Sequence, residues 1–156
     1  MDKKEEQILQ VLQQNGRISN VELARTVELA PSAMLERVKK LEERGLIKGY
    51  TALLDPQALG LGLVAFIFVR VDDINDEPGE ADRTATGLSE LSCVLELHHL
   101  AGDDCLLVKV RARDTDDLYR ILKEEFGKFR GIRTTRTTIV LKTVKETQCL
   151  AIKREE

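Results

Sequence analysis

The sequence predicts a chain of the α+β class, in which a helical N-terminal domain precedes a domain with the element order β-α-β-β-α-β. Two observations carry this prediction. Over residues 1–50, apolar side chains recur at helical spacing, and each run lies between helix start and stop signals. From about residue 61 the pattern changes to apolar runs typical of strands. We therefore expect an N-terminal domain over residues 1–52, a linker over 53–61 and a second domain over 62–156.

Two short helices are expected first. One covers about residues 3–14, and Gly16 ends it. The other begins after Ser19, which has Glu22 three residues later, the spacing of a capping box. Two apolar residues take the hydrophobic-staple positions around this start, Ile18 and Leu23.

A third helix is expected from Pro31, which suits a first helical position, to near Arg44, with Gly45 as the stop signal. Its apolar stripe has the spacing i, i+4, i+7 and consists of Met34, Val38 and Leu41. At about 100° per residue, a polar set points the opposite way and three residues flank it. The polar set is Ser32, Glu36, Lys39, Lys40 and Glu43, and the flanking residues are Ala33, Leu35 and Arg37.

These three helices have the plan of a helix-turn-helix, whose second element enters the major groove of DNA. The same pattern also fits a plain three-helix bundle with a solvated charged face. The charge distribution does not decide between these two interpretations. The net charge is −3. Residues 1–50 carry nine Lys/Arg against eight Asp/Glu, and residues 51–156 carry fifteen against nineteen. One small basic patch binds phosphate weakly, because affinity grows with the number of phosphates neutralised. A DNA-binding chain of this kind therefore needs at least two copies.

The second domain begins after a short strand and linker over residues 45–55, closed by Asp55-Pro56. The stretch Leu63 to Val71 is apolar on both alternations, and such a strand must be covered on both faces. Helices of a small domain suffice for one face, so we expect a partner subunit on the other. One face carries Val64, Phe66 and Phe68, and the other carries Leu63, Ala65, Ile67, Val69 and Val71.

The remaining elements complete a split-βαβ, or ferredoxin-like, plan. We expect helices over about 79–91, weakened by Gly87, and from a cap at Asp114 to a stop at Gly131. The expected strands are 94–100, 106–112 and 132–144, and the tail 149–152 is expected to add one more. This fold by itself says nothing about function.

The sequence resembles the Lrp/AsnC family of leucine-responsive, or feast/famine, transcription regulators. The resemblance is carried by Asn15–Ala24 (NGRISNVELA) and Pro31–Tyr50 (PSAMLERVKKLEERGLIKGY), and it continues through Leu54-Asp55-Pro56 into the second domain. It implies a winged helix-turn-helix, a ferredoxin-like domain for ligand sensing and dimerisation, and a sequence-specific regulator rather than an enzyme. It further implies a homodimer that closes into an octamer-like ring of dimers.

Two positions depart from the family pattern. The family often has Gly in the turn where Glu28 stands, and a glutamate with positive φ is strained by roughly 1 kcal/mol. The family favours Ser at the cap of the third helix, where Ala30 stands, and the missing cap costs about 1 kcal/mol.

The resemblance and the outer face of the third helix together imply binding to double-stranded DNA. Ser32 and Glu36 are placed to face base edges, Lys39 and Lys40 to hold phosphate, and Arg37 suits either role. The full set of expected DNA-binding residues is Ser32, Ala33, Leu35, Glu36, Arg37, Lys39 and Lys40.

The segment Leu100–Leu106 (LAGDDCL) resembles the glycine–acid loop near which amino acids bind at subunit interfaces in this family. The resemblance implies an effector such as leucine or methionine, with backbone N–H groups near Gly102 for its carboxylate and an acidic side chain for its ammonium. Many members carry an acid two places after Asp103, where this chain has Cys105. A plain hairpin with a Gly-Asp turn fits the same segment. The expected effector residues are Leu100, Ala101, Gly102, Asp103, Asp104 and Cys105, with Thr134 and Arg136 from a neighbouring subunit.

Residue patterns for other chemistry are missing. The sequence has no nucleophile elbow, phosphate loop or zinc spacing, so no catalytic or metal-binding residue and no further cofactor is expected. Glu96 and His98 share a strand face and His99 points away, which favours one solvated and one packed histidine over an acid/base cluster with Asp103. The scattered cysteines Cys93, Cys105 and Cys149 favour reduced, apolar side chains.

Location and two alternative functions complete the predictions. The longest apolar run, Leu61 to Val69, is too short to span a bilayer, and the chain opens on Met1-Asp2-Lys3-Lys4 without a signal peptide. A cytoplasmic, nucleoid-associated protein without membrane contact is therefore expected. One alternative is a tetrapyrrole-modifying decarboxylase, since some resemble the same two-part architecture. The other is a nucleoid-structuring protein that needs no effector.

Overall fold

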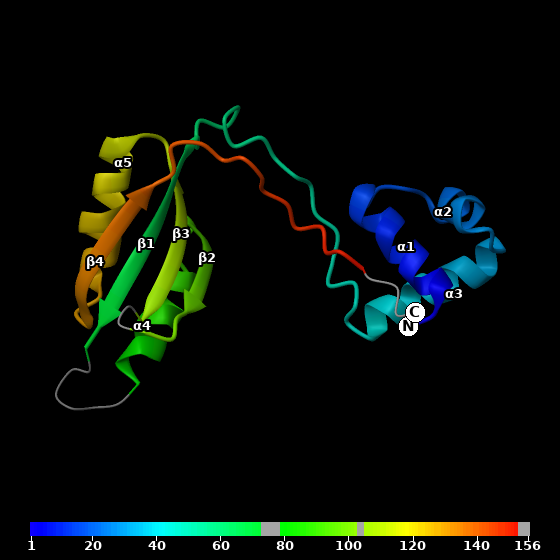
Figure 1. Ribbon diagram of the computed structural model, residues 1–156, viewed down its shortest axis with the longest axis horizontal. Helices are drawn as coiled ribbons and strands as arrows, with labels where there is room; N and C mark the ends of the chain where they lie inside the picture. The colour runs from blue at the N-terminus through cyan, green and yellow to red at the C-terminus, as the bar shows by residue number, and fades with distance from the viewer. Residues whose placement is uncertain (73–78, 103–104, 153–156) are drawn as a thin grey trace. The chain divides into compact units, whose positions relative to one another are not determined.

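The computed structural model describes residues 1–72, 79–102 and 105–152 (Figure 1). The chain forms two compact units, one of Met1–Leu53 with the tail from Lys145 onward and one of Leu54–Val144. The sequence predicts that the whole stretch 62–156 belongs to the second domain. In the structure the tail groups with the N-terminal helices instead. Each unit has its own apolar core. No helix in the described ranges is long and apolar enough to cross a membrane.

The N-terminal unit contains the three expected helices, α1 (Lys3–Gln14), α2 (Asn20–Val27) and α3 (Pro31–Glu43). The predicted capping box of α2 is confirmed, because the Ser19 side chain accepts from the Glu22 backbone and the Glu22 side chain accepts from the Ser19 backbone. One buried cluster joins all three helices and includes the complete predicted stripe of α3: Ile8, Leu23, Ala24, Val27, Met34, Val38 and Leu41.

The turn between α2 and α3 contains a strained residue. Glu28 has φ 57° and ψ 56°, and among the described non-glycine residues it alone has a positive φ. The Leu29 N–H donates to the Ala24 carbonyl at 2.9 Å and the Glu28 N–H donates to the Arg25 carbonyl at 3.3 Å. These two bonds are those of a Schellman motif, whose left-handed position normally holds glycine. The turn therefore forms despite a β-carbon in an unfavourable position.

The second unit is a four-stranded antiparallel sheet with the order β2-β3-β1-β4. Two helices lie between its strands in the sequence, which confirms the ferredoxin-like plan. The elements are β1 (Leu63–Val71), α4 (Glu80–Ser89), β2 (Val94–His99), β3 (Leu106–Ala112), α5 (Thr115–Arg120) and β4 (Ile132–Ile139).

The two faces of β1 meet different surroundings. Ala65, Ile67 and Val69 lie in one buried cluster with residues of α4 and α5, so the helices cover this face. Phe66 and Phe68 point to the opposite, helix-free face, and both remain half-exposed in the single chain. Ile67 is fully buried, so it belongs to the core beneath the helices and does not lie on the face left for a partner.

Several boundaries differ from the sequence predictions. β4 ends at Ile139 rather than residue 144, and neither residues 44–62 nor the tail 140–152, all described, form a strand. Gly87 was read as a weak point in α4, but its role is steric. A β-carbon on Gly87 would lie 2.4 Å from the Phe129 ring, so only glycine admits that ring.

The final helix starts at a well-satisfied polar cluster and then changes its winding. Asp114 caps α5 as predicted, accepting from the Asp117 N–H at 2.8 Å. The buried Asp117 carboxylate accepts from the Arg113 N–H at 3.0 Å and from Arg120 at 2.7 Å. These bonds hold the pKa of Asp117 far below its usual range. Beyond α5 the chain continues as a π-helical turn, Ile121–Glu125, and a 3-10 turn, Phe126–Lys128.

We expect Glu28→Gly to raise the free energy of unfolding by about 1 kcal/mol, because glycine adopts this backbone conformation without the β-carbon clash. Urea unfolding of the full chain, followed by circular dichroism, measures the change. Glu28→Ala is the matched control, since it removes the charge but keeps the β-carbon, and it is expected to leave stability nearly unchanged. Equal stabilisation by both substitutions would show that charge rather than backbone strain matters at this position.

Candidate nucleic-acid interface and effector loop

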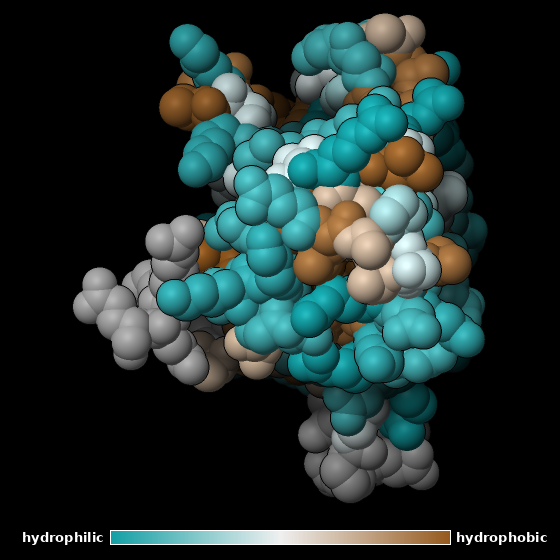
Figure 2. All heavy atoms as spheres, turned by 90° about the vertical axis from the view of Figure 1, so that its right-hand side faces the viewer, coloured by the Kyte–Doolittle hydropathy of each residue, from teal (hydrophilic) through white to brown (hydrophobic). Residues whose placement is uncertain are grey.

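The outer face of α3 is polar and open to solvent. Ser32, Glu36, Lys39 and Lys40 are all exposed, as the helical periodicity predicted. Lys39 lies 3.6 Å from Glu43, a weak surface pair one turn away. Glu36 and Lys40 make no ion pair with any described residue. The view in Figure 2 is largely hydrophilic, with hydrophobic atoms in separate patches.

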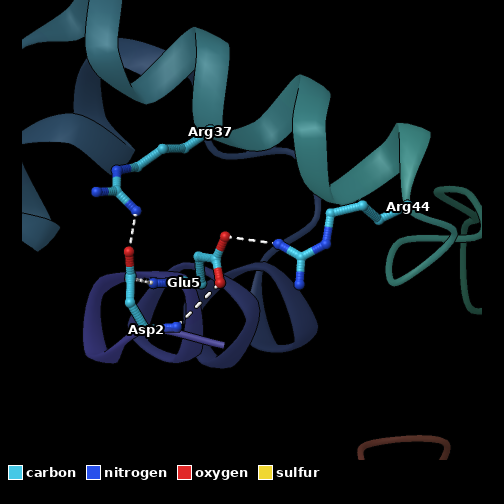
Figure 3. A network of polar contacts seen from close by, with 4 residues as sticks. All are labelled: Asp2, Glu5, Arg37 and Arg44. Carbon is cyan, nitrogen blue, oxygen red and sulfur yellow. Dashed lines mark hydrogen bonds and ion pairs between the residues drawn. The ribbon is translucent and has the colours of Figure 1, made fainter.

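Two other basic residues of α3 and its end are held by α1 instead. Arg37 pairs with the Asp2 carboxylate, and Arg44 donates to Glu5 Oε1 at 2.7 Å (Figure 3). Asp2 and Glu5 also cap α1 reciprocally, since the Glu5 N–H donates to Asp2 at 2.8 Å and the Asp2 N–H donates to Glu5 at 3.0 Å. Each carboxylate therefore caps α1 and holds one arginine.

This network changes what Arg37 can do. Its guanidinium donates to the Asp2 carboxylate and lowers the pKa of that acid, while the Asp2 carboxylate raises the pKa of Arg37. The sequence offered Arg37 as a base or phosphate contact, and the structure directs it toward α1. The Asp2–Glu5 spacing was a usable sequence signal for the capping box of α1, but not for the pairs that these acids make with the two arginines.

The flanks of α3 differ in character. Ala33 is half-buried, whereas Leu35 is 56% exposed although it is apolar. Leu35 borders a surface cavity of about 570 Å³ that is also lined by Tyr50. The Tyr50 hydroxyl donates to Glu42 Oε1 at 3.0 Å, and burial together with this bond raises the pKa of Tyr50 to about 12. At the start of α3, Ala30 provides no side-chain cap, as its residue type predicted.

The predicted effector loop is only partly described. Leu100 is half-buried, and Ala101 and Gly102 are exposed, with Gly102 at φ 142°. Asp103 and Asp104, which were expected to bind the ammonium, lie outside the described residues. A second cavity, of about 620 Å³, is lined by Leu91, Arg111 and Ile121 among others, and no described residue of this loop borders either of these two cavities.

Cys105 is turned into the sheet. Its backbone N–H donates to the Val69 carbonyl at 2.9 Å, and its carbonyl accepts from the Leu100 N–H at the same distance. Its Sγ lies 3.5 Å from the Val71 nitrogen, and the side chain packs against the core. Cys105 therefore closes the hairpin, and its side chain is half-buried.

Thr134 and Arg136 lie on the helix-free face of β4. They pair with Arg70 and Phe68 of β1, and the Arg136 guanidinium stacks 4.0 Å from the centre of the Phe68 ring. Within one chain β1 separates them from β3, a span of two strand spacings or about 10 Å. The described part of the loop and these two residues therefore lie on opposite sides of β1, near the same end of that strand.

The acidic and histidine residues of β2 form ion pairs rather than a catalytic cluster. Glu96 accepts from Lys109 at 2.8 Å and lies 3.7 Å from His98, and Lys109 keeps the pKa of Glu96 low. His99 points the other way, 3.5 Å from Asp82, and both histidines are exposed, so the expected packed histidine is not found. No group of three His, Cys, Asp or Glu residues among those described could hold a metal ion.

Comparison with known protein families matches both units. Residues 1–48 match the model described as a winged helix-turn-helix DNA-binding domain. Residues 64–150 match the model of the Lrp/AsnC ligand binding domain. Together these matches cover the two units that the structure shows.

Individual relatives agree with these matches. The leucine-responsive regulatory protein of Escherichia coli K12 is 37% identical over 153 residues, which span 98% of this chain and 92% of the relative. An HTH-type transcriptional regulator of Pyrococcus horikoshii is 36% identical, covering 98% of this chain and 97% of that one. A transcriptional regulator of Neisseria meningitidis, solved with L-methionine, has a TM-score of 0.89 and 34% identity, covering 97% of this chain and 96% of its own.

Proposed function

This chain belongs to the Lrp/AsnC family of transcription regulators, and we propose that it reads DNA through the outer face of α3 under the control of an apolar amino acid. The observation that carries the proposal is the division of basic residues on α3. Arg37 and Arg44 are used inside the domain, while Lys39 and Lys40 are exposed beside Glu36 and Ser32. A polar face held rigidly from behind suits a helix that enters the major groove.

On this surface the roles follow from position along α3. Recognition helices contact base edges mainly through their N-terminal residues. Ser32 and Glu36 are assigned to base edges, where a glutamate accepts from the amino group of cytosine, and the exposed Leu35 suits a thymine methyl group. Ala33 lies beside them on the inner flank. Lys39 and Lys40 are assigned to phosphates, and Arg37 is assigned to positioning the helix through Asp2.

A homodimer is proposed through the helix-free face of the sheet. Phe66 and Phe68 are half-exposed on this face, and the helices of the chain cover only the other one. A second copy supplies an identical sheet face, as a two-fold interface requires. Dimerisation also doubles the number of DNA-binding helices. Two helices neutralise more phosphates than one, and a single small basic patch binds DNA only weakly. The octamer-like ring of dimers is proposed on the family resemblance alone.

An apolar amino acid, such as leucine or methionine, is proposed as the effector at the Leu100–Cys105 loop. Support comes from two similar structures solved with L-methionine, the Neisseria meningitidis regulator and a feast or famine regulatory protein of Mycobacterium tuberculosis. Gly102 leaves the loop backbone open to a carboxylate, and Thr134 and Arg136 are proposed to approach from a neighbouring subunit. A ligand shared by two subunits changes their assembly and so controls DNA binding.

We expect Lys40→Ala to weaken binding to all DNA sequences alike and to reduce the slope of log K against log salt by about one, because one phosphate contact is lost. Glu36→Ala is expected to change sequence preference at one base position with little change in that slope. Fluorescence anisotropy with specific and scrambled duplexes at several salt concentrations measures both. Unchanged binding in both variants would contradict the assignment of α3.

We expect Phe68→Asp to convert the dimer to a monomer, because it replaces an apolar ring of the proposed interface with a carboxylate that would have to be desolvated there, even beside the Arg136 guanidinium. Light scattering at micromolar concentration measures the mass. Thr86→Asp is the matched control, since Thr86 is exposed on α4, and it is expected to stay dimeric. A monomeric wild type, or a dimeric and folded Phe68→Asp variant, would refute this interface.

We expect leucine or methionine to bind the wild type in titration calorimetry, and a charged amino acid to bind far more weakly. Asp103→Ala is expected to lose most of this affinity because the ammonium loses its charge-assisted partner. Asp116→Ala, which removes an exposed acid on α5, serves as the control. If no amino acid binds at millimolar concentration, or Asp103→Ala binds as well as wild type, the proposed site is wrong.

A further inference from the structure

The C-terminal tail lies against α1 through a set of polar contacts that the functions above do not use. The Leu150 N–H donates to Gln13 Oε1 at 2.6 Å, and the Gln13 Nε2 donates to the Leu150 carbonyl at 3.2 Å. The Cys149 thiol lies 3.5 Å from the Gln13 carbonyl oxygen. These residues are 136 and 137 positions apart in the sequence, so the contacts are tertiary.

The chemistry of these contacts is selective. A glutamine side chain offers one acceptor and a pair of donors, so it can satisfy both backbone groups of one extended residue at once. Gln13 lies in the last turn of α1, where backbone carbonyls have no partner within the helix. The Cys149 thiol reaches one of these carbonyls. The tail is shaped locally as well, because the Cys149 N–H donates to the Thr147 hydroxyl at 3.1 Å.

We propose that the C-terminal tail is a clasp on the DNA-binding domain, with Gln13 as the residue that recognises the backbone of Leu150. The clasp gives this domain a second connection to the sheet, in addition to the linker that leads into β1. Both connections leave the sheet at one end, since Ala65 pairs with Ile139 and the Val140 N–H donates to the Val64 carbonyl at 2.9 Å.

The clasp provides a route from the effector residues to DNA, and this consequence rests on the proposed function. Thr134 and Arg136 lie on β4, and the chain that follows β4 becomes the tail. A change in the position of β4 therefore pulls on α1 through Leu150 and Gln13. The linker and residues 140–148 are both irregular, but two tethers fixed at the same end of the sheet restrict the DNA-binding domain more than one tether does.

The direct test is amide hydrogen exchange at Leu150 in the full chain. Wild type is expected to protect this amide at least about fivefold relative to an unstructured peptide, and Gln13→Ala is expected to remove the protection. Gln13→Glu keeps the acceptor and loses the donor, so it is expected to retain part of it. Gln14→Ala, an exposed neighbour, is the control and should behave as wild type. An unprotected Leu150 amide in wild type, or full protection in Gln13→Ala, overturns the clasp.

A second variant tests the same contact from the tail and leaves α1 intact. Leu150→Pro removes the donor of the 2.6 Å bond. Its readout is the rate at which N-ethylmaleimide modifies Cys149, followed by peptide mass spectrometry. Cys149 is exposed and its thiol is held by the Gln13 carbonyl, so the rate is expected to rise in Leu150→Pro, by the same factor in Gln13→Ala, and no further in the double variant, because each variant frees the thiol from that contact. Additive effects of the two substitutions contradict a shared contact.

The coupling is tested by DNA affinity with and without saturating methionine. Gln13→Ala is expected to bind methionine as wild type does, while the methionine-induced change in DNA affinity falls at least about twofold. An unchanged response in Gln13→Ala refutes the coupling. If methionine leaves the DNA affinity of wild type unchanged, methionine is not the effector, and the exchange at Leu150 still decides whether the clasp exists.

Discussion

The apolar character of both faces of β1 is the constraint on which the sheet domain depends. The core needs Ile67 and Val69 beneath the helices, and the alternation of a strand then puts Phe66 and Phe68 on the other face. Burying one phenylalanine side chain contributes about 1.5–3 kcal/mol, so leaving this face in water forgoes a large stabilisation. A second sheet placed there recovers it. The proposed dimer also supplies a second DNA-binding domain. One strand therefore determines the core, the proposed dimer interface and the number of DNA-binding domains in the assembly.

In the DNA-binding domain, charged residues both orient the recognition helix and form its outer surface. A recognition helix needs exposed cations, but it also needs a fixed orientation. In α3 the two requirements are met by different residues: Arg37 and Arg44 hold the helix against the acidic N-terminus of α1, and Lys39 and Lys40 face outward. Each acid on α1 serves twice, because Asp2 and Glu5 also cap their own helix. The exposed pairs contribute little individually, and their value lies in the geometry of the network.

Local signals in the sequence predicted most of the fold. Ser19 and Glu22 located the start of α2, and Asp114 located the start of α5, because a cap acts within one turn of chain. Alternation fixed the two faces of β1, but it could not say which of them the helices cover; the burial of Ile67 shows that it is the face that also carries Ala65 and Val69. The low helix propensity of glycine predicted that Gly87 only weakens its helix. The sequence does not show that the Phe129 ring approaches this residue.

Local sequence patterns did not predict the contacts that join distant parts of the chain. Spacing placed Arg37 on the flank of α3, and only the position of Asp2 across the domain decides what it binds. The Gln13 contact with Leu150 has no local signature, because a surface glutamine and a backbone amide occur throughout any sequence. The end of a strand likewise depends on its partner strand. β4 ends at Ile139, where its pairing with Ala65 of β1 ends, five residues before the end predicted from its Thr-rich pattern.

In the proposed function, the strand pair β1–β4 is the physical connection between effector binding and DNA binding. An effector controls DNA affinity only if it binds two arrangements of the protein with different strength. The loop residue Cys105 bonds to Val69 near one end of β1, and Thr134 lies opposite Arg70 at that same end. The linker and the tail leave from the other end. A ligand that moves β4 against β1 therefore shifts the two connections of the DNA-binding domain together, and a stiff antiparallel pair carries that shift along its whole length.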